Sequence, residues 1–134
     1  MTTPLDTRLN ALSPAVIALF RAVLGFSITI HGAQKLFAWP AGPAVPVGVW
    51  PLWYAGILEF VLGLLILTGL FTRIAAFIAS GVMAFAYFTV HQPKGLLPIA
   101  NGGELAVLYC FAFFLLVFIG GGAYALDSLR RPRA

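Results

Sequence analysis

The sequence predicts an all-α protein of the integral membrane class: a four-helix bundle with both termini in the cytoplasm. Three observations support this fold class. The chain is 61% hydrophobic and only 9% charged, whereas average soluble domains carry about 25% charged residues. Its mean hydropathy is +0.99. Its apolar residues form continuous runs, each close to the length of about 20 residues that a helix needs to cross a bilayer, rather than the alternating segments of a membrane barrel.

Start and stop signals place the helices in order along a single domain. Ser13 as N-cap and Pro14 in the first turn predict the start of the first helix. Thr72 is the expected N-cap of the third helix, and Pro93 is expected to stop it. Glu104 opens the fourth helix, where the helix dipole favours an acid. The predicted domain covers residues 1–134, with helices at about 14–37, 52–70, 73–90 and 103–126.

Prolines and glycines shape the segments between and within these helices. Residues 38–51 hold four prolines and two glycines, so this connection is expected to be an irregular loop. Tryptophans such as Trp39 and Trp50 flank it, as in the aromatic belt at a membrane interface. In the second helix, Gly56 and Gly63 lie on nearly the same face. That face is expected to pack closely on a neighbouring helix.

Basic residues are distributed unevenly between the two ends of the predicted helices. Lys35 and Lys94 fall on one side, and the remaining basic residues outside the helices fall on the side of the termini. The positive-inside rule therefore predicts cytoplasmic termini. The first apolar segment contains Arg21 and is too long for a signal peptide, so it is expected to be retained. The basic residues on the terminal side are Arg8, Arg73, Arg130, Arg131 and Arg133.

Charge and cysteine content exclude several function classes. The formal net charge is +4, but the basic residues lie at segment ends, so no nucleic-acid partner is expected. Cys110 is the single cysteine. An internal disulfide, a CxxC redox pair and a thiolate metal cluster are therefore excluded, and a disulfide-exchanging enzyme is not expected.

Ionisable residues inside the apolar segments are the candidate functional residues. A charge in hydrocarbon costs a few kcal/mol, so each is expected to face a partner, a cavity or an interface. All four predicted helices bring such residues to the outer third of the membrane. Arg21 lies toward the cytoplasm instead, where a structural ion pair or a lipid headgroup contact is expected. The candidate ligand-binding residues are His31, Lys35, Glu59, His91, Asn101 and Glu104.

Structural roles remain open for the same residues. Lys35 can extend its ammonium group to the interface, and Glu104 can serve only to favour a helix terminus. Glu59 can pair with His31 or Arg21 and hold the first two helices in register. A haem site is not expected, because the two histidines do not lie at matched depth. A metal site is not expected either, because no HxxH or HExxH spacing occurs.

A third chemical alternative is a pocket for a molecule with a polar head and an apolar tail, such as a quinone. In this interpretation Lys35 and His31 donate hydrogen bonds to a quinone oxygen, and Glu59 and Glu104 relay protons. No catalytic residue is assigned.

The order and spacing of several short motifs give the chain a family resemblance. From about Ala18 to Asp127 it resembles the DoxX family of small four-helix membrane proteins. The motifs are Arg21 with Gly25, His31-Gly32 with Lys35-Leu36-Phe37, Glu59 with Gly63, the Gly69–Ala76 turn, His91, Asn101–Glu104 and Gly120–Asp127.

The resemblance implies a multi-pass protein of the bacterial inner membrane with a redox-associated function. Some members of the family are subunits of quinone-linked thiosulfate oxidoreductases or of terminal oxidase complexes. We therefore expect a membrane subunit that serves a redox partner protein and is not a catalyst alone. Quinone is the expected cofactor, membrane lipid an expected partner, and a homodimer an open arrangement. A small solute transporter and a membrane scaffold for another protein are the alternative functions.

Overall fold

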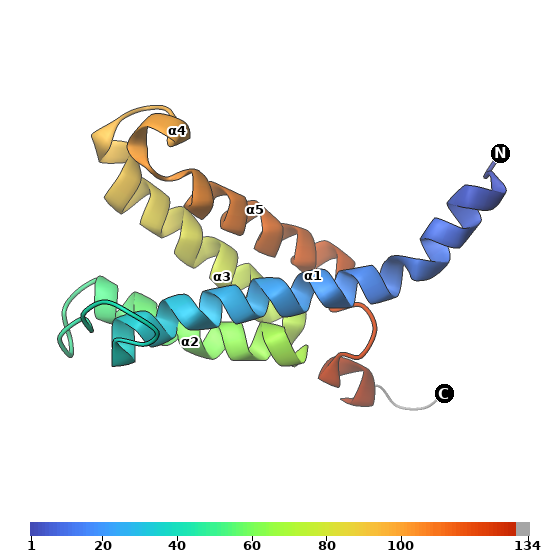
Figure 1. Cartoon of the computed structure of the whole chain (residues 1–134), viewed down its shortest axis with the longest axis horizontal. Helices are drawn as coiled ribbons and strands as arrows, with labels where there is room; N and C mark the ends of the chain where they lie inside the picture. Colours follow the sequence, from blue (N-terminus) through green and yellow to red (C-terminus); the bar gives the residue numbers. More distant parts are fainter. Residues whose placement is uncertain (131–134) are drawn as a thin grey trace.

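The computed structural model describes residues 1–130, in which the regular secondary structure is helical and no strand occurs. Four long α-helices account for most of this part of the chain, as Figure 1 shows. A π-helical turn and two 3-10 turns complete the described segment, together with a single short α-helical turn, α4. The elements are α1 (Pro4–Phe37), α2 (Leu52–Thr68), α3 (Thr72–Ala86), η1 (Tyr87–His91), η2 (Gln92–Lys94), α4 (Pro98–Asn101), α5 (Glu104–Ile119) and η3 (Leu126–Arg130).

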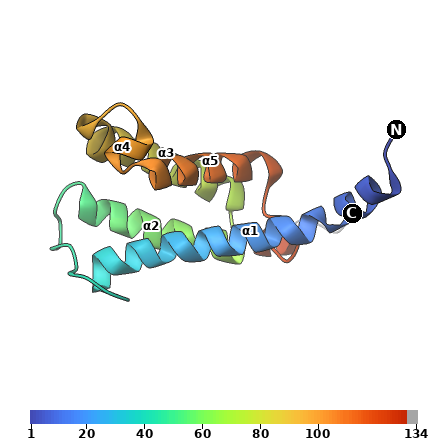
Figure 2. The ribbon, with the colours of Figure 1, turned by 45° about the horizontal axis from the view of Figure 1, so that its top comes forward.

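The long helices pack as two pairs. Helix α1 packs mainly on α2, helix α3 packs mainly on α5, and α2 and α3 join the pairs. The pairs lie close together at the end where α2 joins α3, and they diverge toward the end that carries α4 (Figures 1 and 2). The start of α1 and the η3 turn lie at the same end of the molecule, and α1 projects beyond the other helices there.

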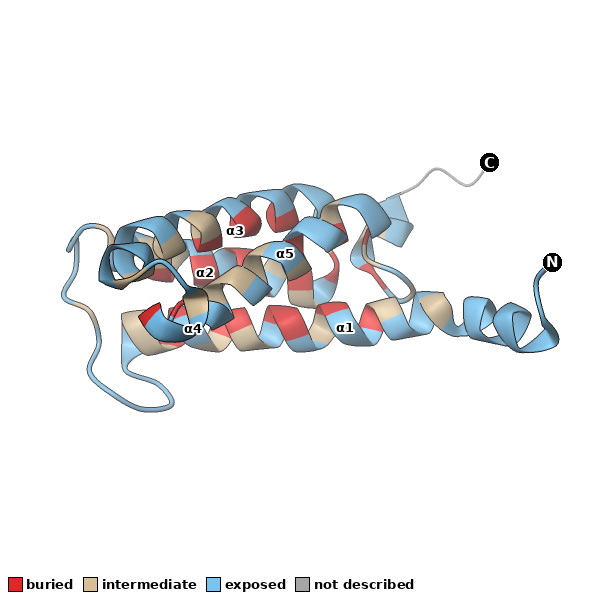
Figure 3. Ribbon diagram, turned by 90° about the horizontal axis from the view of Figure 1, so that it is seen from above, coloured by how far each residue is buried: buried red, intermediate tan, exposed pale blue. Residues whose placement is uncertain are grey.

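A small core fills the space between the pairs, and the outward faces are apolar. Buried residues line the inner faces of the helices, whereas the outer faces are exposed (Figure 3). Phe113 of α5 is 0% exposed, as is Ile66 of α2. In contrast, Phe26, Phe77 and Phe111 are 56%, 65% and 66% exposed. Such an extensive apolar exterior is typical of a surface that faces lipid.

Two helical segments are long and apolar enough to cross a membrane. They are Pro4–Phe37 and the continuous helical run Thr72–Lys94. The helices Leu52–Thr68 and Glu104–Ile119 are apolar but shorter. The α-helical geometry of the second run ends at Ala86, and π-helical and 3-10 turns extend the run to Lys94, one residue beyond the predicted stop at Pro93.

Glycines let α1 and α2 approach closely. A Cβ atom added to Gly32 of α1 would collide with the backbone nitrogen of Phe60, and one added to Gly63 of α2 would collide with Thr29. A Cβ atom on Gly56 would lie 2.9 Å from the Cβ atom of Lys35. The expectation that Gly56 and Gly63 form a packing face is therefore confirmed, and this face packs on α1.

The first helix begins at Pro4 and not at Pro14, so the predicted start was wrong. Thr3 and Asp6 form a capping box that satisfies the first backbone N–H groups. Pro14 lies inside the helix, where it lacks an N–H donor. The Ser13 hydroxyl donates to the Leu9 carbonyl at 3.2 Å, as a serine in a helix interior does, and so caps nothing.

The fourth long helix ends at Ile119 rather than near residue 126. Gly120 and Gly122 have φ angles of 75° and 70°, which non-glycine residues rarely adopt. The chain then folds back, and the Ala123 N–H donates to the Pro14 carbonyl at 2.9 Å. The expected basic residues Arg131 and Arg133 lie outside the described residues.

Candidate functional site

A cavity of about 300 Å³ lies where the two helix pairs diverge. We call it the Lys35 cavity. Four of the predicted site residues line it, and they come from α1, α2 and the end of the α3 run. Its volume is at the lower limit of small-molecule sites, which begin at about 300 Å³. Its polar lining residues are His31, Lys35, Glu59, His91 and Tyr109, and its apolar ones include Ile28, Leu52, Met83, Val90 and Leu105.

The central polar feature is an ion pair between the first two long helices. Nζ of Lys35 lies 2.5 Å from Oε2 of Glu59. The two side chains are 19% and 7% exposed, so the charges are largely withdrawn from solvent. Glu59 therefore pairs with Lys35, and the alternatives that paired it with His31 or Arg21 were wrong. Lys35 lies one helical turn after His31 on the same face of α1. The close contact between α1 and α2 brings its side chain within reach of Glu59.

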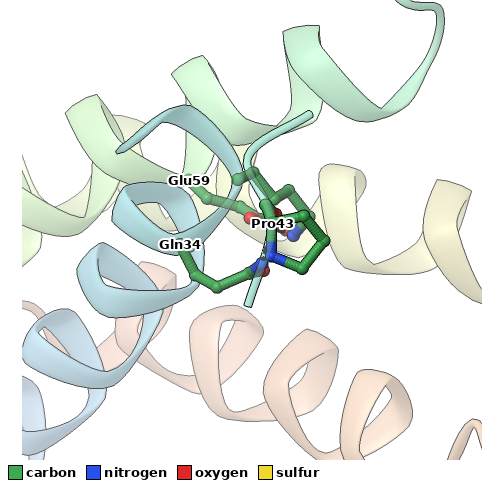
Figure 4. Close-up of polar contacts among 4 residues, drawn as sticks. Gln34, Pro43 and Glu59 are labelled. Atoms are coloured by element: carbon green, nitrogen blue, oxygen red, sulfur yellow. Dashed lines mark hydrogen bonds and ion pairs between the residues drawn. The ribbon is translucent and has the colours of Figure 1, made fainter. Parts of the chain in front are cut away.

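The proline-rich loop covers the end of α1 next to this ion pair. The Gln34 side chain donates to the Pro43 carbonyl at 3.1 Å (Figure 4). The Val45 N–H donates to the Lys35 carbonyl at 2.7 Å. These two contacts hold the proline-rich loop beside Lys35. The residues that line the cavity come from the helices and from Gly102, and not from this loop.

His31 and Tyr109 meet at the opening between α1 and α5. Their ring centroids lie 5.9 Å apart in an edge-to-face arrangement. Tyr109 also stacks on Phe113, with centroids 5.9 Å apart. The ring pair lines both the Lys35 cavity and a neighbouring groove beneath Pro40. Sequence reasoning missed Tyr109, although it is the one tyrosine in the apolar run of α5 and so the one phenol hydroxyl there.

His91 and Asn101 lie together, but only the histidine lines the cavity. Nδ1 of His91 is 3.3 Å from the Asn101 carbonyl oxygen. The Asn101 amide donates to the Gly95 carbonyl at 2.9 Å and to the Tyr87 hydroxyl at 3.2 Å. Its side-chain oxygen accepts from the Gly103 N–H at 2.8 Å. The buried Asn101 side chain is thus engaged in holding the loop and does not face the cavity, contrary to the prediction.

Glu104 is also absent from the cavity wall. It is exposed at the start of α5, with Gly103 as the preceding cap residue. Its place in the first turn agrees with the structural alternative, in which an acid stabilises the helix terminus. The structure therefore brings together four of the six predicted binding residues and leaves Asn101 and Glu104 outside.

Arg21 lies at the other end of the molecule and forms no ion pair with any residue from 1 to 130. The side chain is 4% exposed, and its Nε and Nη1 atoms have no hydrogen-bond partner in this part of the chain. A Cβ atom on Gly69 would collide with its guanidinium group. The expected ion pair of Arg21 is therefore not formed within residues 1–130, where the Asp127 carboxylate accepts the Phe71 and Thr72 N–H groups instead.

Asp127 caps the third long helix from a distant part of the chain. Its carboxylate accepts from the Phe71 N–H at 2.7 Å and from the Thr72 N–H at 2.9 Å. Phe71, not Thr72, is therefore the cap residue, and the predicted Thr72 cap was wrong. Burial raises the pKa of Asp127, but the hydrogen bonds from Thr72 and Phe71 and the charge of Arg130 outweigh burial, so its pKa is below the ordinary value.

Within residues 1–130, the His, Cys, Asp and Glu side chains do not form a group of three that could hold a metal ion. The Lys35 cavity instead combines a buried ion pair with ring nitrogens and a phenol hydroxyl on an otherwise apolar surface. This arrangement can donate hydrogen bonds to a ligand oxygen and surround an apolar ring.

Comparison with known proteins agrees with the motifs. The sequence model of the DoxX family matches residues 16–92, a segment that includes His31, Lys35, Glu59 and His91. An uncharacterized protein of Haemophilus influenzae is 46% identical over 121 residues, which cover 86% of this chain and 90% of that protein. No solved structure matches the chain. On the family match and this level of identity, the chain belongs to the DoxX family of membrane proteins.

Proposed function

We propose that this protein is a membrane subunit that binds a quinone in the Lys35 cavity and serves a redox partner protein. The observation that carries the proposal is the buried Lys35–Glu59 ion pair in the wall of a cavity that is otherwise mainly apolar. Intramembrane charges that face a cavity are typical of functional sites. A quinone has the matching chemistry, because its carbonyl oxygens accept hydrogen bonds and its ring and tail are apolar.

Each polar group of the cavity has a separate role in this proposal. The Lys35 ammonium group and one nitrogen of His31 donate to the quinone oxygen, and the Tyr109 hydroxyl is a further donor on the facing helix. Glu59 holds Lys35 in place. Lys35 would pass a proton to the oxygen of the reduced quinone and would take one back from solvent through Glu59. In this proposal the cavity supplies hydrogen bonds and protons, and the partner protein supplies the electrons.

The same proposal includes a four-span topology in the bacterial inner membrane. At about 1.5 Å per residue, α2 with its 17 residues is about 25 Å long, somewhat short of a hydrocarbon core of about 30 Å. Local thinning of the bilayer accommodates such a helix at modest cost. The basic residues Arg8, Arg73 and Arg130 lie at the end where α1 begins, which supports cytoplasmic termini.

Quinone titration of the purified protein in detergent tests the proposal. We expect the wild-type protein to bind a short-tailed ubiquinone or menaquinone analogue in isothermal titration calorimetry. The His31→Ala/Lys35→Met double variant should weaken binding at least about tenfold, because each lost hydrogen bond to a polar ligand group contributes roughly 1 kcal/mol. The matched control is Lys94→Met, because Lys94 is an exposed lysine near the same end and lies outside the cavity.

Two results would contradict the proposal. An unchanged quinone affinity in the double variant would show that the quinone binds elsewhere. Equal weakening by Lys94→Met would show that the effect is a general loss of positive charge. Circular dichroism of each variant establishes that the helices are retained, so that a loss of binding is not a loss of folding.

A further inference from the structure

A second hollow lies at the end of the molecule opposite the Lys35 cavity, and the quinone proposal does not use it. Its volume is about 610 Å³, and we call it the Arg73 hollow. Arg73 and Arg130 are its basic residues, and Asp127 is its acid. Apolar side chains of α1, α3 and α5, such as Ile17 and Ile74, form the rest of the wall. The hollow therefore combines positive charge with apolar walls.

Arg73 and Arg130 retain N–H groups that can donate to a ligand, whereas the Asp127 carboxylate already accepts hydrogen bonds from the chain. Nη1 of Arg73 donates to the carbonyls of Val117 and Phe118, both at 2.7 Å. Its Nε and Nη2 groups make no further hydrogen bond with residues 1–130. The guanidinium of Arg130 lies over the Phe71 ring, 4.1 Å from its centroid, which leaves the edges of the group exposed. Asp127 already accepts two backbone hydrogen bonds.

Unsatisfied polar atoms lie directly beneath the floor of the hollow. In the described part of the chain, the buried side-chain atoms without a hydrogen-bond partner are Arg21 Nε, Arg21 Nη1 and Thr72 Oγ1. The Arg21 guanidinium lies beside Gly69, in the turn between α2 and α3, and Thr72 Oγ1 lies beside Gly121. A Cβ atom on Gly121 would lie 3.1 Å from Thr72 Oγ1 and 3.6 Å from Arg21 Cδ. Gly121 also lines the hollow, so Thr72 Oγ1 and the Arg21 side chain lie next to its wall.

Charge and wall chemistry together identify the ligand class. Arg21, Arg73 and Arg130 together with Asp127 give this region a net charge of two positive units. Arg21 lies in the low-dielectric interior, where Coulomb forces are strong. An anion is therefore favoured. Ile74 is 63% exposed and Ile119 is 38% exposed on faces that meet lipid. We propose that the Arg73 hollow binds the phosphate of an anionic phospholipid, with its acyl chains along these apolar walls.

Native mass spectrometry of the full chain in detergent tests this site. Phosphatidylglycerol is titrated against phosphatidylcholine, and inorganic phosphate is the competitor. We expect phosphatidylglycerol to bind more tightly than phosphatidylcholine. Arg130→Gln should weaken phosphatidylglycerol binding about fivefold, the effect of one basic residue near an anionic lipid surface. Arg130 is exposed outside the core, so this variant retains the fold. Arg8→Gln is the matched control, because Arg8 is exposed near the start of α1 and does not line the hollow.

Three results would overturn the proposal. Equal affinity for both lipids would mean that the phosphatidylglycerol charge is not recognised. Equal weakening by Arg8→Gln and Arg130→Gln would mean that the attraction is diffuse and not local to the hollow. Displacement of phosphatidylglycerol by an equal concentration of inorganic phosphate would make this a site for free phosphate and not for a lipid.

Discussion

The ammonium group of Lys35 and the carboxylate of Glu59 meet at 2.5 Å between α1 and α2, in side chains that are 19% and 7% exposed. This ion pair lies where glycines bring the two helices into close contact, since a Cβ atom on Gly56 would lie 2.9 Å from the Cβ atom of Lys35. The contact thus places two costly charges within reach of each other. The same two charges form part of the cavity wall, so the contact between the helices and the cavity share one ion pair.

Removing one partner of this pair should destabilise the protein far more than removing both. Glu59→Gln leaves the Lys35 charge without its partner, which we expect to lower the free energy of unfolding by about 3 kcal/mol. The Lys35→Met/Glu59→Leu double variant replaces both charges with apolar groups of similar size and should recover most of that loss. Denaturant unfolding in detergent, followed by circular dichroism, measures both. A double variant as unstable as Glu59→Gln would contradict the expectation.

The close contact of α1 and α2 predicts opposite effects for two glycine-to-alanine substitutions. Gly32→Ala adds a methyl group that collides with the backbone of Phe60, and the helices must separate, which we expect to cost about 1–3 kcal/mol. Gly81→Ala is the matched control, because nothing lies within 4 Å of its Cβ position in α3. Alanine there should stabilise the helix by about 0.5–1 kcal/mol. The same unfolding measurement separates the two, and equal signs would argue against a tight interface.

The membrane class, the helical segments and the clustering of polar residues could be predicted from the sequence. Long apolar runs dictate helices, because a helix satisfies its own backbone hydrogen bonds in lipid. Alternating chain direction then brings the end of the first run near the start of the second. This reasoning places His31, Lys35, Glu59 and His91 at one end, and all four line the same cavity.

The remaining features depend on contacts between distant segments. Asp127 caps a helix that starts 55 positions earlier in the chain, so no local pattern around Thr72 reveals it. Ser13-Pro14 has the sequence of a helix start, yet the Thr3 capping box upstream already supplies one. Asn101 has the side chain of a ligand donor, but its three hydrogen-bond partners within the chain show that it is engaged elsewhere. Local signals show which residues are polar, whereas tertiary contacts decide which of them remain available.

Asn101 should therefore behave as a loop anchor and not as a ligand contact. Asn101→Ala leaves the Gly95 carbonyl and the Gly103 N–H without partners, and we expect a loss of about 2 kcal/mol in stability. Backbone amides of the loop between His91 and Glu104 should exchange with deuterium faster. Asn101→Asp keeps the acceptor for Gly103 and should lose less. Unchanged exchange together with weakened quinone binding would instead support the direct ligand role predicted from the sequence.

Asp127 should make stability depend on pH in a definite direction. Its pKa in the folded protein is below the ordinary value of 3.8, so the unfolded chain binds protons more readily between those two values. The free energy of unfolding should therefore rise with pH across that window, and the contribution of Asp127 should be complete above it. As pH falls through the folded pKa, the hydrogen bonds to the Phe71 and Thr72 N–H groups lose their charged acceptor.

Asp127→Ala isolates this contribution from the other three acids of the chain. The variant should lose about 1 kcal/mol at neutral pH, as other capping residues do, and the difference from wild type should shrink as the pH falls below 3.8. Asp6→Asn is the control. The pKa of Asp6 is also lowered, by the side-chain and backbone hydrogen bonds of Thr3. Asp6, however, is fully exposed at the start of α1. A difference between wild type and Asp127→Ala that stays constant with pH would mean that packing, and not the charged cap, supplies the stability.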